Sequence, residues 1–101
     1  MIRELANTPA IGAFSLAEAR VAPGVTTELH RLSVDEWYVI SEGAGLVEVG
    51  GETAAVGPGD VVAIPAGAHQ RITSTGDAEL VFLCVCLPRF TPDCYEPLED
   101  R

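Results

Sequence analysis

The stretch that decides the fold is "GVTTELHRLSVDEWYVISEG", residues 24–43, in which His30 and Glu36 stand six residues apart between two glycines. Residues two apart in a strand share a face, so His30 and Leu32 would point into the same interior. By the same rule Glu36 and Tyr38 form a second inward row. The stretch therefore predicts strands that present an imidazole and a carboxyl group to one interior, either as metal ligands or as hydrogen-bonded core groups.

The segments on either side of this stretch are short apolar runs separated by Gly and Pro. Residues 46–51, "LVEVGG", alternate and predict a hairpin that turns at Gly50–Gly51. "DVVAIP" (60–65) and "ELVFLCVCL" (79–87) predict strands that are buried on both faces, the second long and central. Residues 11–21 are expected to form a strand as well. The pattern predicts an all-β sandwich or barrel of about eight to ten short strands.

The last segment differs in composition from the rest of the chain. "PRFTPDCYEPLEDR" (88–101) is rich in proline, which cannot donate a hydrogen bond to a sheet. We therefore expect residues 89–101 to form a tail without a strand, which Phe90 and Tyr95 pin to the outside of the barrel. The interpretation is a single domain over 1–101, with the barrel spanning about 11–88.

Charge and cysteine content exclude several classes of protein. Six basic residues against fifteen acidic ones give a net charge of −9, which argues against nucleic-acid binding and against docking on anionic lipid. No apolar run is long enough to cross a bilayer, and "MIRELANTPAIGAF" lacks the pattern of a secretory signal, so we expect a cytoplasmic protein. The three cysteines are interpreted as buried thiols rather than as a disulfide framework.

With these residues in view, the chain resembles the cupin family over roughly residues 20–88. The first cupin motif is Gly, five spacers, His, one spacer, His, three or four spacers, Glu, six spacers, Gly; the second is Gly, five spacers, Pro, one spacer, Gly, two spacers, His, three spacers, Asn. The positions that match are Gly24, His30, Glu36, Gly43, Gly59, Pro65 and Gly67. The resemblance implies a cupin jelly-roll β-barrel.

The sequence departs from both motifs at the positions of the usual metal ligands. Leu32 replaces the second His of the first motif, Gln70 replaces the His of the second motif, and Ser74 replaces its Asn. An amide oxygen is a poor transition-metal ligand and a leucine is none. The resemblance therefore implies a weakened metal site, or none.

The resemblance implies that His30, Glu36 and Gln70 would be the ligands of one divalent ion of iron, manganese, nickel or zinc. A one-residue slip after Gly67 would bring His69 inward in place of Gln70 and complete a set of two His and one Glu. The alternative is a metal-free pocket, in which His30 and Glu36 act as an acid–base pair and burial raises the pKa of Glu36.

Two classes of function follow from the resemblance. One is an enzyme of lyase, isomerase or dioxygenase type that acts on a small organic substrate through His30, Glu36 and Tyr38. The other is a non-catalytic barrel that binds a small molecule and has lost its metal site. In both cases we expect no nucleic-acid or membrane partner and a homodimer in which the first twenty residues and Trp37 contribute to the interface.

Overall fold

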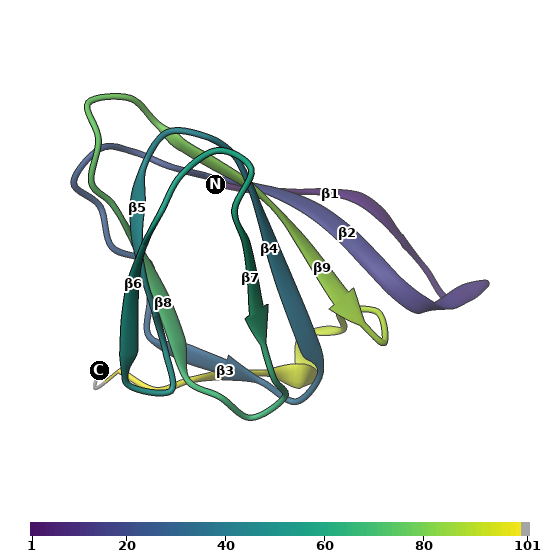
Figure 1. The fold of residues 1–101 in the computed structure, drawn as a ribbon. Helices are drawn as coiled ribbons and strands as arrows, with labels where there is room; N and C mark the ends of the chain where they lie inside the picture. Colours follow the sequence, from purple (N-terminus) through teal and green to yellow (C-terminus); the bar gives the residue numbers. More distant parts are fainter. Residues whose placement is uncertain (100–101) are drawn as a thin grey trace.

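The computed structural model describes residues 1–99, which form two antiparallel five-stranded sheets facing each other (Figure 1). In spatial order the first sheet contains β1 (Ile2–Thr8), β2 (Ile11–Val21), β9 (Leu80–Leu87), β4 (Asp35–Glu42) and β7 (Val61–Ile64). The second sheet contains β10 (Tyr95–Pro97), β3 (His30–Leu32), β8 (Gln70–Ser74), β5 (Gly45–Val49) and β6 (Glu52–Val56). The predicted all-β barrel is confirmed.

The core lies between the two sheets and follows the alternation of the strands. In the first sheet Phe82 of β9 lies opposite Ala19 of β2 and Ile40 of β4, so the three side chains share the inner face. Val47 of β5 and Ile72 of β8 meet them from the second sheet, and all five residues are buried. Full burial of a side chain such as Phe82 contributes about 1.5–3 kcal/mol. This packing fixes the strand register that places the polar residues further along β4 and β9.

Strand β7 differs from its prediction as a strand buried on both faces. It is the outermost strand of the first sheet, and among residues 1–99 it pairs only with β4, so one of its edges has no strand partner. Ile64 is buried, whereas Val61 is 57% exposed. A continuous apolar run does not distinguish a central strand from an edge strand, because both contain the same β-branched residues.

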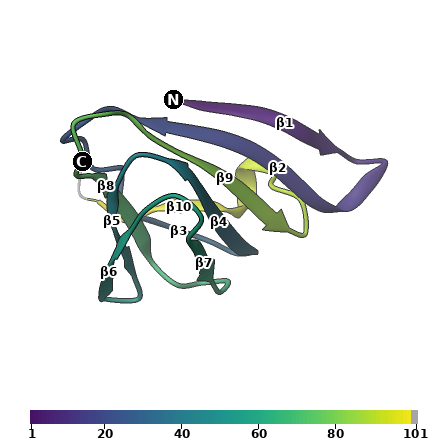
Figure 2. The same cartoon turned by 45° about the horizontal axis from the view of Figure 1, so that its top comes forward.

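The prediction of a tail without a strand was wrong. Residues Tyr95–Pro97 form β10, which pairs with β3 at the edge of the second sheet and is part of the yellow C-terminal segment in Figure 2. An edge strand tolerates proline because one side of it needs no hydrogen-bond donor, and Pro97 is its last residue. The preceding short helix η1 (Pro92–Cys94) buries Cys94 against Leu32. The tail therefore closes one end of the barrel instead of lying on its outside.

The N-terminal residues form a strand, β1, that extends the first sheet. Together with β2 it makes a long hairpin that projects beyond the barrel, as the purple ribbon in Figure 1 shows. Several apolar side chains of this hairpin are exposed: Ile2, Leu5, Ile11 and Phe14. The strand predicted over residues 11–21 is confirmed as β2, whereas no strand was expected over Ile2–Thr8.

Gly43 sits where the chain turns from β4 to β5, and we expect its replacement to destabilise the fold. Its φ is +83°, and an added Cβ would lie 2.6 Å from the Glu79 carbonyl oxygen and 2.9 Å from Leu80 Cα. Both atoms are backbone and cannot move aside, so we expect Gly43→Ala to lower the free energy of unfolding by about 2–4 kcal/mol. Urea denaturation measures this loss.

Gly24 provides the matched control for Gly43. Its φ is +80°, but no atom lies within 4 Å of the position that a Cβ would take. Gly24→Ala should therefore show the backbone penalty alone, about 1–2 kcal/mol. Equal losses in the two variants would contradict the close approach between the Gly43 turn and β9.

Candidate functional site

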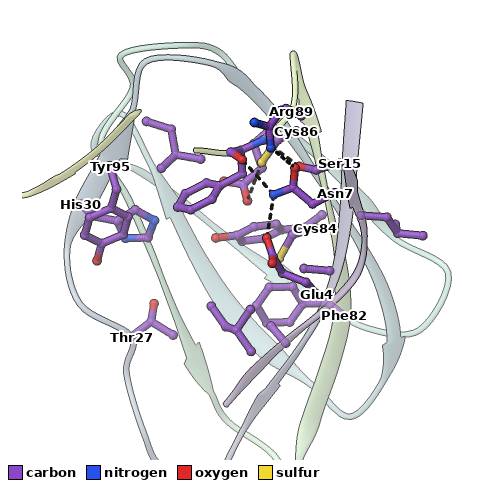
Figure 3. A pocket seen from close by; sticks show the side chains of 18 of the residues that line it. Glu4, Asn7, Ser15, Thr27, His30, Phe82, Cys84, Cys86, Arg89 and Tyr95 are labelled. Carbon is purple, nitrogen blue, oxygen red and sulfur yellow. Dashed lines mark hydrogen bonds between the residues drawn. The ribbon is translucent and has the colours of Figure 1, made fainter. Parts of the chain in front are cut away.

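A cavity of about 830 Å³ opens between the first sheet, β3 and the C-terminal tail (Figure 3). Apolar side chains form most of its wall, among them Ala17, Ala19, Val21, Leu32, Phe82 and Phe90. Polar side chains are placed at other points of this wall, among them Glu4, Asn7, Ser15, His30, Glu36, Tyr38, Arg89 and Tyr95. A concave, mainly apolar cavity with a small number of convergent polar groups is typical of a site for a small organic molecule.

Glu36 is held at the cavity by a chain of buried hydrogen bonds. Tyr38 donates from its hydroxyl to Gln70 Oε1, and Gln70 Nε2 donates to Glu36 Oε1 at 2.8 Å. Cys86 Sγ lies 3.8 Å from Glu36 Oε2 and donates to it. The two ends of the Gln70 amide are thus assigned by their partners, and the amide fixes the orientation of the carboxyl group.

Burial sets the protonation behaviour of this cluster. Removal of Glu36 from water raises the pKa of its carboxyl group, while the hydrogen bonds from Gln70 and Cys86 partly oppose the shift. Burial also raises the pKa of the Cys84 thiol and of the Tyr38 hydroxyl well above their ordinary values, and raises the pKa of Cys86 to about 12. As expected from the sequence, burial is the main cause of the raised pKa of Glu36.

His30 contributes a nitrogen lone pair to the same cavity. Its Nδ1 lies 2.7 Å from the Glu28 backbone oxygen, which can only accept, so Nδ1 carries a proton and Nε2 is the nitrogen that can accept one. The ring stacks on Tyr95 with centroids 4.8 Å apart, and Figure 3 shows the two rings side by side at one edge of the cavity. The stack and the hydrogen bond together fix the direction of Nε2.

Of the other positions considered as metal-ligand positions, Leu32 lines the cavity, whereas Gln70 and His69 do not. Leu32 is buried and lines the cavity together with His30, at the position where the resemblance expects a histidine. Gln70 is fully buried opposite His30 in the strand register, yet it does not reach the cavity wall. It therefore orients Glu36 rather than a substrate. His69 lies outside the cavity lining, so the slip that would bring it inward does not occur.

The donors present do not fit a firmly held transition metal. Protein sites for such ions use three or more His, Cys or carboxylate ligands. Within residues 1–99 no three such groups come close enough together to hold one ion. His30 Nε2 and Glu36 are two donors, and the thiols beside them are kept protonated by burial. No reaction step is therefore assigned to a metal ion.

Several residues of the cavity were not predicted from the sequence. Asn7 and Ser15 belong to the projecting hairpin, and Arg89, Phe90 and Tyr95 belong to the tail. All of them lie outside the two motifs. The single usable signal was the pair of aromatic residues in the tail, which was interpreted as external packing instead of as part of a cavity wall.

Comparison with known proteins places this architecture among described families. Residues 17–86 match a family model described as "Cupin domain". An uncharacterised protein of Methanocaldococcus jannaschii is 37% identical over 86 residues, which are 84% of this chain and 69% of that protein. In the part of the chain that the structure describes, no helix is long and apolar enough to span a membrane.

Solved structures with the same fold include two informative neighbours. A cupin 2 domain-containing protein from Halorhodospira halophila is 27% identical with a TM-score of 0.79, over 92% of this chain and 71% of that one. The oxalate decarboxylase of Lactobacillus farciminis, solved as a formate complex, is 26% identical with a TM-score of 0.85. That match covers 96% of this chain but 30% of the decarboxylase, so this chain spans less than a third of that enzyme.

Proposed function

Because this chain belongs to the cupin family, we propose that it binds a small organic molecule in the barrel cavity and catalyses proton transfer on it. The observation that carries the proposal is that the basic Nε2 of His30 and the buried carboxyl group of Glu36 line one cavity. An imidazole base and a carboxylic acid whose pKa is raised suit removal and return of a proton near neutral pH. This chemistry is that of an isomerase or a lyase.

The roles of the two residues follow from their environments. His30 Nε2 takes a proton from a carbon atom next to a carbonyl group, and the imidazolium that forms keeps its hydrogen bond from Nδ1 to the Glu28 oxygen. Glu36, whose carboxyl pKa is raised by burial, donates a proton to the carbonyl oxygen, so that an enol results. Reversal of both transfers regenerates the side chains.

The alternative is a barrel that binds a small molecule without acting on it. The two substituted ligand positions, Leu32 and Gln70, support this alternative, because they remove the metal chemistry that the family motif provides. The formate complex of the L. farciminis enzyme supports a small organic molecule as ligand under either reading.

Hydrogen–deuterium exchange of a bound ketone distinguishes catalysis of proton transfer from binding without catalysis. The chain, treated with a chelator, is incubated in D₂O with cyclohexanone or with phenylpyruvate, and loss of the signal of the enolisable protons is followed by NMR. Exchange faster than in buffer supports proton transfer without a metal. Binding of either compound without faster exchange supports the alternative, and metal analysis of untagged protein before the chelator step shows whether an ion accompanies the chain.

We also propose a cytoplasmic homodimer. The three cysteines are free thiols, as expected in a reducing compartment. On the outer face of the first sheet, Leu16, Val85 and Trp37 are cross-strand neighbours and form an apolar stripe, and Trp37 is 42% exposed. The projecting hairpin adds an unpaired strand edge with no charged residue between 5 and 17. A second copy covers both without bringing acidic groups together.

For the dimer we expect deletion of residues 1–12 to weaken association and to lower the melting temperature together. The deletion removes β1 and exposes the edge of β2. Trp37→Ser is a milder variant that keeps β1, and Leu46→Ser is its control, because Leu46 is 43% exposed on the other sheet. Sedimentation velocity should show dissociation of the first two variants and an intact dimer for the control. A wild-type chain that is monomeric at micromolar concentration contradicts the proposal.

A further inference from the structure

We propose that Arg89 is the receptor for a carboxylate group of the ligand, which makes the ligand class an organic acid with an apolar body. This inference rests on the proposed function and specifies its substrate class. Arg89 follows β9, belongs to neither cupin motif and lies in the cavity wall with Phe90. Figure 3 shows it at the end of the cavity where Asn7 and Ser15 gather, away from the stacked rings of His30 and Tyr95.

Arg89 differs from the other described arginines in its partners. Arg3, Arg20, Arg31 and Arg71 each pair with a carboxylate, at N–O distances of 2.7 to 3.5 Å. Within residues 1–99 Arg89 forms no ion pair, although the chain has a net charge of −9. A guanidinium group without a carboxylate, in a wall that is mainly apolar, attracts an anion from outside the protein.

The guanidinium group is held in position by a neutral side chain. Arg89 NH1 donates to Asn7 Oδ1 at 2.7 Å, and the Asn7 amide nitrogen donates to Glu4 Oε2 and to the Phe90 carbonyl oxygen. Asn7 thus uses its whole amide to separate the Glu4 carboxylate from Arg89. One nitrogen of Arg89 is occupied by this contact, and the other donors of the fork remain for a carboxylate.

The backbone around Arg89 is also fixed to the hairpin. Arg89 N donates to the Gly12 carbonyl oxygen at 3.1 Å, and Phe90 N donates to Ser15 Oγ at 2.8 Å. The tail and the hairpin therefore form one end of the cavity as a unit. A receptor that is fixed before binding loses little conformational freedom when the ligand arrives.

The rest of the cavity indicates what the carboxylate is attached to. Apolar side chains make up much of the remaining cavity wall, among them Ala17, Phe82 and Phe90. An acid whose body is apolar or weakly polar can bury that body there while Arg89 binds its carboxylate. The reactive carbon then lies toward His30 and Glu36, and Arg89 acts by binding and orienting the substrate, with no proton transferred at its nitrogens.

Binding of phenylacetate and of phenylacetamide, its neutral isostere, tests the inference. Titrations followed by ¹H–¹⁵N NMR should give about tenfold or more tighter binding of phenylacetate to the wild-type chain. The Arg89 Nε–H signal should shift with phenylacetate and not with phenylacetamide. Arg89→Gln should abolish the preference, whereas the control Arg71→Gln should retain it, because Arg71 is paired with Glu48 and does not line the cavity.

The other possible results contradict either the role of Arg89 alone or the role of Arg89 together with the proposed function. Equal binding of the two compounds to the wild-type chain, or a preference that survives in Arg89→Gln, overturns the carboxylate receptor. In that case binding and exchange of neutral cyclohexanone leave the proposed function in place. Absence of binding and of exchange for phenylacetate, phenylacetamide, cyclohexanone and phenylpyruvate overturns both. If Arg89→Gln does not fold, the wild-type Nε–H titration alone decides the question.

Discussion

Glu36→Gln is expected to slow the exchange reaction of the chain by about 100- to 10,000-fold, the usual contribution of a general acid or base. The amide has the shape of the carboxyl group, so the hydrogen bond from Gln70 Nε2 can be kept. It cannot deliver a proton, however. Rates of deuterium incorporation into the exchange probe at saturating protein measure the loss, and His30→Gln should show a loss of similar size.

The same variant should be more stable than the wild-type chain at neutral pH. Because burial raises the pKa of Glu36 in the folded state, folding binds protons, and ionisation of the buried carboxyl group lowers stability as the pH rises through its folded pKa. Glu36→Gln removes this loss, and its advantage should disappear below the ordinary carboxyl pKa of 4.5. Glu48→Gln, on the outer side of β5, serves as the control for both rate and stability.

If Glu36 is an active-site acid, Glu36→Gln should lower activity while raising stability. If Glu36 is a structural group, the substitution should lower both. A variant that loses stability together with activity would indicate that Glu36 holds the barrel together through its hydrogen bonds, and the proton-transfer role would then be wrong. An unchanged exchange rate in a folded Glu36→Gln chain would also contradict that role.

The inward and outward rows of β4 could be predicted because strand geometry is local. Glu36, Tyr38 and Ile40 are buried, as expected from the period of two, and Trp37 is exposed between them. The turn at Gly50–Gly51 was equally predictable, since both glycines have positive φ, as a tight hairpin of this kind requires. These features depend on neighbours within a few residues.

The closure of the cavity could not be predicted because it depends on pairings between distant segments. The stack of His30 on Tyr95 joins residues 65 positions apart, and the contact between Asn7 and Arg89 joins residues 82 positions apart. Proline in the tail indicated an absence of strand, yet an edge position relaxes that restriction for Pro97. The sequence motif thus identifies the interior residues, whereas the hairpin and the tail, which complete the site, have no local signature.

Leu32→His is expected to raise the affinity of the chain for Zn²⁺ or Ni²⁺ by about 100-fold or more, because it adds a third strong ligand to His30 and Glu36. Leu32 lies two residues after His30 on β3, and both side chains line the cavity. The added imidazole therefore enters the space that the two existing donors face. Isothermal titration of chelator-treated protein measures the change in affinity.

Arg31→His is the matched control for this substitution. It adds a histidine to the same strand, but the Arg31 side chain is exposed and pairs with Glu96 on the outside of the barrel. Its metal affinity should stay at the wild-type level. A folded Leu32→His chain whose affinity equals that of Arg31→His would show that position 32 does not share an interior with His30 and Glu36.

The stability of Leu32→His, measured with and without zinc, also tests whether position 32 lies beside His30 and Glu36. Leu32 is buried against Cys86 and Phe90, so a metal-free histidine there should lower the free energy of unfolding by about 2–3 kcal/mol. A metal ion that binds the folded state tightly returns stability in proportion to the logarithm of its concentration over Kd. Zinc should therefore raise the melting temperature of Leu32→His and leave that of Arg31→His unchanged. Recovery of stability by zinc in the first variant alone would show that a histidine at position 32 of β3 shares a metal site with His30 and Glu36.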